Sequence, residues 1–87
     1  NDTEDGLHIT SMAGSWMSVV RGFAGMQVKD GLLHLAPVLP TGWEGFSFKI
    51  HYRERSLGVK VTGGLCEVSL LSGTPLQIVV DNERRQL

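Results

Sequence analysis

Apolar and polar side chains alternate without a break along Phe46-Ser47-Phe48-Lys49-Ile50-His51-Tyr52-Arg53. Because successive side chains of a strand point to opposite faces, this period of two predicts a β-strand with one buried face. The alternation returns at Leu57, Val59 and Val61, with Lys60 on the opposite face. Arg53-Glu54-Arg55-Ser56 forms the turn between the two runs. The segment therefore predicts neighbouring strands that cover a hydrophobic core.

Turn-forming residues divide the rest of this region into further short strands. Asp30-Gly31 separates Met26–Lys29 from Leu32–Leu35, and Asp-Gly favours the tight turn of a hairpin. The turns and strands expected after Val61 are, in order, Gly63-Gly64, residues 65–71, Ser72-Gly73-Thr74-Pro75 and residues 76–80. The tail 81–87 either adds an edge strand or frays. This spacing predicts a mainly β fold, a small antiparallel β-sandwich.

The pattern before Met26 is different. Apolar residues follow the three-and-four spacing of a helix face, at Ile9, Met12, Ala13, Trp16, Val19, Val20 and Phe23. The opposite face carries small residues, including Gly14 and Gly22, and Arg21 is the only ionic residue in the segment. We therefore expect one α-helix that packs against neighbours on most sides and ends near Gly25, which suits a left-handed cap.

Composition excludes several classes of function. The 87 residues form one small domain with a net charge of -1, and the basic residues are scattered, so nothing favours nucleic acid or an anionic membrane as a partner. The acidic N-terminus lacks the pattern of a signal peptide, and no segment is apolar enough to span a bilayer. A single cysteine, Cys66, suits a reducing compartment. We therefore predict a cytoplasmic location.

Four motifs carry a family resemblance: Gly6-Leu7-His8, Ala13-Gly14-Ser15-Trp16, Gly22-Phe23-Ala24-Gly25-Met26 and Leu39-Pro40-Thr41-Gly42-Trp43. With the residues between them, they resemble the C-terminal end of glycoside hydrolase family 65, which includes maltose, trehalose and kojibiose phosphorylases and some glucosidases. The resemblance implies that residues 1–25 hold the last helix of a catalytic (α/α)6 barrel. It also implies that residues 26–87 form the C-terminal β domain, for which the family offers no catalytic role.

The chemistry that the resemblance implies is inverting phosphorolysis of an α-glucosidic disaccharide such as maltose. A carboxylic acid protonates the leaving oxygen, and phosphate attacks the anomeric carbon from the opposite face, which gives β-glucose 1-phosphate. The family's general acid lies in the barrel, upstream of this chain. We therefore expect a C-terminal fragment that is inactive by itself, with no catalytic residue, metal or cofactor. Inorganic phosphate and the disaccharide are substrates of the longer protein, and the barrel is this segment's partner.

In the phosphorylases of the family, the histidine of the Gly-x-His motif belongs to the phosphate pocket. The resemblance therefore implies that His8 has this role in the intact enzyme. A helix start also favours an anion through its free backbone N–H groups and its dipole. Ser11, in the expected first turn, would add a hydroxyl donor. The alternative is structural: His8 packs at the start of the helix, and Thr10 or Ser11 caps it.

The other notable side chains favour structural roles. Trp16 is expected in the core, and Trp43 is expected to anchor its loop against the sheet or the barrel. His34 and His51 alternate with apolar residues and have no partner at metal-ligand spacing. Cys66 has no recognisable base beside it, so we expect a small buried residue rather than a nucleophile.

Two other functions stay open at the level of sequence. The longer protein would be a hydrolase if a carboxylate-activated water replaced phosphate. A free-standing carbohydrate-binding β module is a third possibility, although it has few planar aromatic residues and leaves the helix without a purpose. Once separated from the barrel, the helix is expected either to fold back over the open face of the sheet or to mediate self-association.

Overall fold

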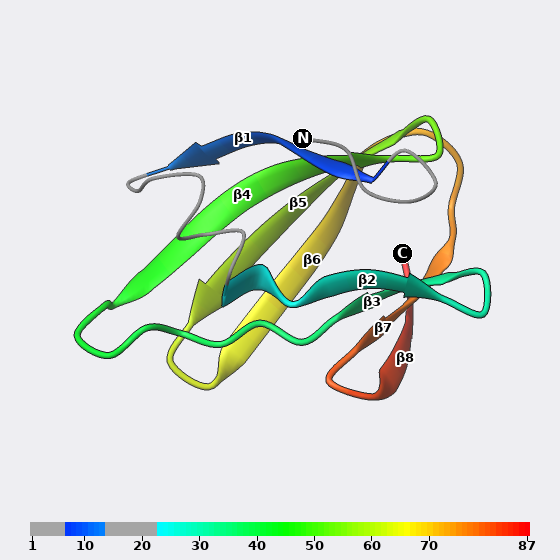
Figure 1. Ribbon diagram of the computed structural model, residues 1–87. Helices are drawn as coiled ribbons and strands as arrows, with labels where there is room; N and C mark the ends of the chain where they lie inside the picture. The colour runs from blue at the N-terminus through cyan, green and yellow to red at the C-terminus, as the bar shows by residue number, and fades with distance from the viewer. Residues whose placement is uncertain (1–6, 14–22) are drawn as a thin grey trace.

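The computed structural model describes residues 7–13 and 23–87, which form the β-rich fold in Figure 1. The strands are β1 (His8–Ala13), β2 (Met26–Lys29), β3 (Leu32–Leu35), β4 (Gly45–Tyr52), β5 (Arg55–Thr62), β6 (Leu65–Ser72), β7 (Gln77–Val80) and β8 (Glu83–Gln86). They form two four-stranded sheets with the orders β1-β4-β5-β6 and β2-β3-β7-β8. The predicted mainly β sandwich is therefore confirmed for the described residues.

One strand pair departs from the antiparallel prediction. Strands β3 and β7 pair in parallel, with Leu33 opposite Ile78 and Leu35 opposite Val80. Parallel neighbours need a long crossover, and here the crossover consists of the whole β4–β6 meander in the other sheet. The short turns along the sequence specify only neighbouring strands, so they gave no sign of this pairing.

Tight turns with two residues of positive φ join three pairs of antiparallel strands. The residues and their φ angles are Asp30 (55°) and Gly31 (76°), Arg53 (48°) and Glu54 (64°), and Asp81 (49°) and Asn82 (67°). Positive φ at both positions is the mark of a type I′ turn, whose twist matches that of the flanking strands. The hairpin predicted at Asp30-Gly31 is confirmed. The tail forms the edge strand β8 rather than fraying, because Asp81-Asn82 turns the chain back onto β7.

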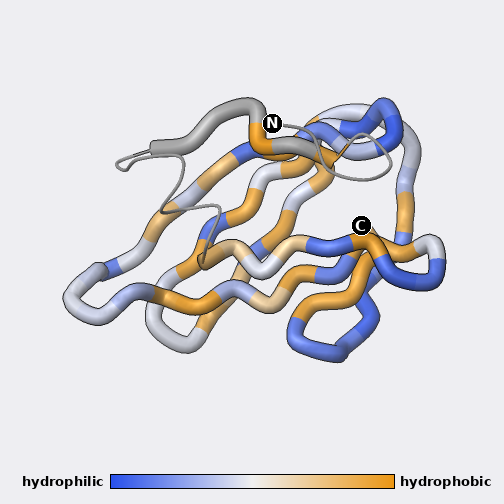
Figure 2. Tube along the Cα trace, in the orientation of Figure 1, coloured by the Kyte–Doolittle hydropathy of each residue, from blue (hydrophilic) through white to orange (hydrophobic). Residues whose placement is uncertain are grey.

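The core lies between the inner faces of the two sheets. The alternating residues of β4 and β5 are buried as the sequence predicts, from Phe46 to Tyr52 and from Leu57 to Val61. The other sheet contributes Leu33, Leu35, Ile78 and Val80, each at most 1% exposed. Figure 2 shows the resulting alternation of hydrophobic and hydrophilic segments along the strands. The core therefore closes with aliphatic and aromatic side chains from both sheets.

The predicted helix is the main correction. Residues 8–13 form strand β1, which pairs antiparallel with β4. Leu7 and Ile9, two residues apart, are both buried, so this segment also satisfies the period of a strand. The edge of β4 offers unpaired backbone groups, and residues 8–13 satisfy them by pairing. The remainder of the expected helix, residues 14–22, lies outside the described residues, and Trp16 lies there too.

The backbone returns to the described region just before β2. Phe23 and Ala24 have helical backbone geometry, and Gly25 follows with a φ of 62°. A left-handed residue is a common way to end a helical segment. The positive φ predicted for Gly25 is therefore confirmed.

Candidate functional site

The two predicted phosphate ligands both lie on β1, where the structure describes their backbones. His8 is opposite His51 of β4, and Ser11 is opposite Lys49. The register shifts between Ile9 and Ser11, so both backbones lie opposite β4 residues, His51 and Lys49, that alternate with the buried residues of that strand. The structure therefore brings the backbones of His8 and Ser11 to one strand, beside a histidine and a lysine.

The physical argument for an anion at His8 does not hold for this backbone. That argument required free N–H groups and a dipole at the start of a helix, whereas His8–Ala13 is a strand. A phosphate role for His8 and Ser11 stays a prediction about the longer protein.

Acidic residues in the described part of the chain lie on its surface. Asp30, Glu44, Glu54, Glu67, Asp81 and Glu83 are all exposed. A general acid for glycosidic cleavage usually needs a carboxyl group with a raised pKa, which burial provides. None of the residues in 7–13 and 23–87 offers such an environment. The same residues contain no group of three or more potential metal ligands.

The aromatic residues of the sandwich serve its core. Trp43 is half-buried and packs against the core, and its ring meets that of Phe46 edge-on, with centroids 6.0 Å apart. Phe46 in turn stacks on Phe48 at 5.9 Å. Trp43 therefore anchors its loop to the sheet, as predicted. Among the described residues no aromatic side chain is exposed as a flat surface on which a sugar would stack.

Tyr52 has an unusual environment at the end of β4. It is 2% exposed, and its hydroxyl oxygen is buried without a hydrogen-bond partner. The guanidinium carbon of Arg53 lies 5.1 Å from the centre of the Tyr52 ring, at cation–π distance. A buried polar group that lacks a partner lowers stability, so Tyr52 is a weak point of an otherwise apolar core.

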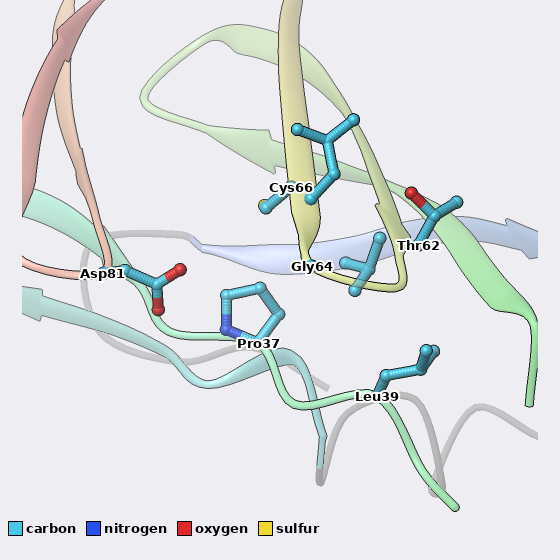
Figure 3. Close-up of a pocket in the computed structure, with 8 residues that line it drawn as sticks. Pro37, Leu39, Thr62, Gly64, Cys66 and Asp81 are labelled. Carbon is cyan, nitrogen blue, oxygen red and sulfur yellow. The ribbon is translucent and has the colours of Figure 1, made fainter. Parts of the chain in front are cut away.

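A pocket of about 210 Å³ opens where one end of the first sheet faces the loop after β3 (Figure 3). Pro37 and Leu39 come from this loop, Asp81 from the β7–β8 turn, and Thr62, Leu65 and Cys66 from the ends of β5 and β6. In the sequence this loop is marked by the Leu39-Pro40-Thr41-Gly42-Trp43 motif and by the anchoring role predicted for Trp43. Neither indicates that the loop faces the β5–β6 turn.

Cys66 lines this pocket and is 7% exposed. Burial raises the pKa of its thiol above the ordinary value; Arg85 lowers it and Asp81 raises it by smaller amounts. Arg85 Nη1 also donates a hydrogen bond of 2.7 Å to the carbonyl oxygen of Cys66. A thiol with a raised pKa is a poor nucleophile at neutral pH. The prediction of a small buried residue is confirmed.

Comparison with known proteins decides the family. Residues 26–87 match the model described as "Glycosyl hydrolase family 65, C-terminal domain". The chain belongs to this family. The match begins at Met26, the first residue of β2.

Individual relatives extend the similarity beyond this domain. Maltose phosphorylase of Bacillus subtilis is 47% identical over 83 residues, which are 95% of this chain and 11% of the relative. Alpha,alpha-trehalose phosphorylase of Geobacillus stearothermophilus is 42% identical over 99% of this chain and 11% of the relative. Alignments of this extent necessarily include residues before Met26.

A solved structure shares the fold. The chain superposes on "Putative kojibiose phosphorylase from human microbiome" with a TM-score of 0.73 and 30% identity, over 83% of this chain and 11% of that one. The present chain thus spans about a tenth of the length of the relatives that it matches. No helix within the described residues has the length and apolar character needed to cross a membrane.

Proposed function

We propose that this chain is the C-terminal part of an inverting phosphorylase that cleaves an α-linked glucose disaccharide with inorganic phosphate. The products would be β-glucose 1-phosphate and glucose. In this proposal residues 26–87 support the catalytic part and perform no chemistry themselves. A cytoplasmic location suits an enzyme whose only cysteine here, Cys66, is a free thiol.

One observation carries the proposal. The similarity to proteins named maltose phosphorylase and trehalose phosphorylase extends over 95% and 99% of the chain, so it includes the segment before the C-terminal domain. The absence of a buried carboxyl group from residues 7–13 and 23–87 agrees with a general acid elsewhere in the longer protein.

The chemistry assigns a limited role to the chain's own residues. Phosphate must be held on the face of the sugar opposite the leaving group for inversion to occur. A protonated His8 would donate a charge-assisted hydrogen bond to a phosphate oxygen, and the hydroxyl group of Ser11 would donate a second. Both donors would act only together with groups of the catalytic part.

The test uses the full-length protein from which this chain derives. Purified protein is incubated with maltose, trehalose or kojibiose, each with and without phosphate, and glucose 1-phosphate and glucose are quantified. The proposal predicts that one disaccharide is consumed only when phosphate is present, with equal amounts of the two products. The isolated chain, assayed in parallel, should show no turnover.

Two results would overturn the proposal in different ways. Release of two glucose molecules without phosphate would make the longer protein a hydrolase. Turnover by the isolated chain would contradict its supporting role. Saturable binding of a disaccharide to the isolated chain, with no activity in the longer protein, would instead favour a carbohydrate-binding module.

A further inference from the structure

The loop after β3 is tied to the point where the polypeptide enters the sandwich. The backbone N–H of Ala36 donates to the carbonyl oxygen of Gly25 at 3.1 Å, and that of Val38 donates to the carbonyl oxygen of Phe23 at 2.8 Å. Gly25 approaches Ala36 so closely that a Cβ atom at position 25 would collide with the Ala36 carbonyl group. Whatever precedes residue 23 therefore emerges directly beside this loop.

This region also carries two of the three large hydrophobic side chains that are exposed among the described residues. Val38 is 59% exposed and Leu65 is 54% exposed, whereas the third such side chain, Leu71 (51%), lies at the far end of β6. Leu65 lines the pocket in Figure 3 together with Pro37 and Leu39, the two neighbours of Val38 in the loop. Single exposed apolar residues are common, but a group around a hollow marks an interaction surface.

A second, shallower hollow extends the same surface. It has a volume of about 360 Å³ and shares Val61 and Thr62 with the first pocket. Glu44 and Lys60 line it, and Asp81 lines the first, so exposed charged residues surround the apolar centre. An apolar centre with a polar rim is the usual anatomy of a protein–protein interface.

We propose that Val38, Leu65 and the pocket beside them, here called the junction surface, are the docking surface for the catalytic part of the longer protein. The inference rests on the proposed function and deepens it by naming the surface. The partner that covers this surface is inferred from where the rest of a longer polypeptide would join the sandwich. The domain is C-terminal in its family, and about nine-tenths of the relatives' length lies outside the match. That polypeptide joins the sandwich at the tethered Phe23–Gly25 segment.

The chain supplies its own matched control. Leu65 and Leu71 are leucines of similar exposure on the same strand, β6. They lie about 20 Å apart, because a strand rises about 3.3 Å per residue. The account predicts that Leu65 is covered by the catalytic part, whereas Leu71, at the far end of the strand, is outside the junction surface.

The experiment compares L65E, V38E and L71E in the full-length protein by limited proteolysis. A charge within the junction surface should make proteolytic release of the sandwich at least about tenfold faster. The reason is that the free energy of burying one apolar side chain exceeds that of a tenfold change in the docking equilibrium. L71E should cleave at the wild-type rate within about twofold, as expected for an exposed site. Each substitution in the isolated chain should leave its thermal midpoint unchanged, which excludes a folding defect.

Other outcomes overturn the inference. Unchanged proteolysis in both L65E and V38E would place the catalytic part elsewhere, and an equal effect of L71E would show that any added charge suffices. A dimer of the full-length protein that L65E converts to monomer, with unchanged proteolysis, would assign the surface to a second copy. Phosphorolysis by the wild-type protein is assayed separately, so its absence, with the L65E effect on proteolysis retained, would refute the proposed function and keep the docking surface.

Discussion

Strand β1 and the sandwich of residues 26–87 are held in place in different ways. Strands β2 and β3, β4 and β5, β5 and β6, and β7 and β8 are each joined by a tight turn. Strand β1 has no such turn: it pairs with the edge of β4 alone, and its register shifts within six residues. The family's C-terminal domain begins after it.

This difference separates the strand pairs that residues 26–87 form by themselves from the pairing of β1, which depends on a free edge of β4. Where a tight turn joins two neighbouring strands, the turn itself fixes the register of their pairing. Strand β1 occupies an edge that residues 26–87 leave open, so its place depends on that edge being free. We propose that β1 belongs to the catalytic part of a longer protein and that β2–β8 form the supporting domain.

The sharpest test compares two isoleucines on the same rung of the first sheet, Ile9 of β1 and Ile50 of β4. Both are buried, at 6% and 0% exposed. Ile50→Ala should cost about 2–5 kcal/mol of unfolding free energy, through lost burial and the cavity that it leaves. Ile9→Ala should cost about 1–2 kcal/mol of unfolding free energy, because β1 can detach locally while the rest of the sandwich stays folded. The loss cannot exceed the free energy with which β1 is attached to β4. Denaturant unfolding of the isolated chain measures both. Equal losses would make β1 an integral strand of the sandwich.

The junction between the two regions gives the next largest effect. Gly25→Ala places a side chain at a φ of 62° and against the carbonyl group of Ala36. We expect a loss of about 2 kcal/mol or more in unfolding free energy, from backbone strain and the displaced loop. Gly63→Ala is the control, since a Cβ atom there meets nothing within 4 Å. A similar loss in both variants would show that the loop is not clamped at Gly25.

A gain in stability is expected at Tyr52, which lies one residue beyond the β4 positions that β1 pairs with. Tyr52→Phe removes a buried hydroxyl group that has no partner and keeps the ring under Arg53. The unfolding free energy should rise by up to about 1 kcal/mol, because an unsatisfied buried group is costly. A clear loss of stability in thermal unfolding would mean that the hydroxyl group forms a hydrogen bond.

The smallest effect concerns pH and belongs to the sandwich alone. Burial raises the pKa of the Cys66 thiol in the folded chain above its ordinary value in the unfolded chain. Between these two pKa values the unfolded thiol has lost its proton and the folded thiol has kept it. Stability therefore falls as the pH rises through this window. Denaturant midpoints measured from neutral to alkaline pH should decline less steeply for Cys66→Ala. Parallel declines would show that the thiol does not contribute.

Much of the sandwich was predictable because its information is local. The alternation from Phe46 to Tyr52 fixes which face of β4 is buried, and Asp30-Gly31 fixes the first hairpin. Both signals extend over a few neighbouring residues and do not depend on distant parts of the chain. The family resemblance was likewise confirmed, because it rests on residues along nearly the whole chain.

The remaining features depend on contacts between distant residues. Leu33 and Ile78 pair in parallel between β3 and β7, which are separated in the sequence by three other strands. No turn residue in the sequence indicates this pairing. Strand β1 was mistaken for a helix because Ile9, Met12 and Ala13 fit a helical face, whereas Leu7 and Ile9 fit a strand face. Neither the helical nor the strand period indicates which other elements the segment packs against. The pocket beside Leu65 forms only when the sheets pack, so no local sequence pattern indicates it.

One kinetic measurement separates the two regions by function. If the full-length protein has the proposed activity, His8→Ala, within β1, should raise KM for phosphate about tenfold and leave KM for the disaccharide unchanged, since a charge-assisted hydrogen bond is lost at one substrate only. Glu67→Gln, on the exposed face of β6, should change neither constant. This pair of results would place the segment before Met26 in the phosphate site and the sandwich outside it. An unchanged KM for phosphate in His8→Ala, or an equal rise for both substrates, would contradict our account.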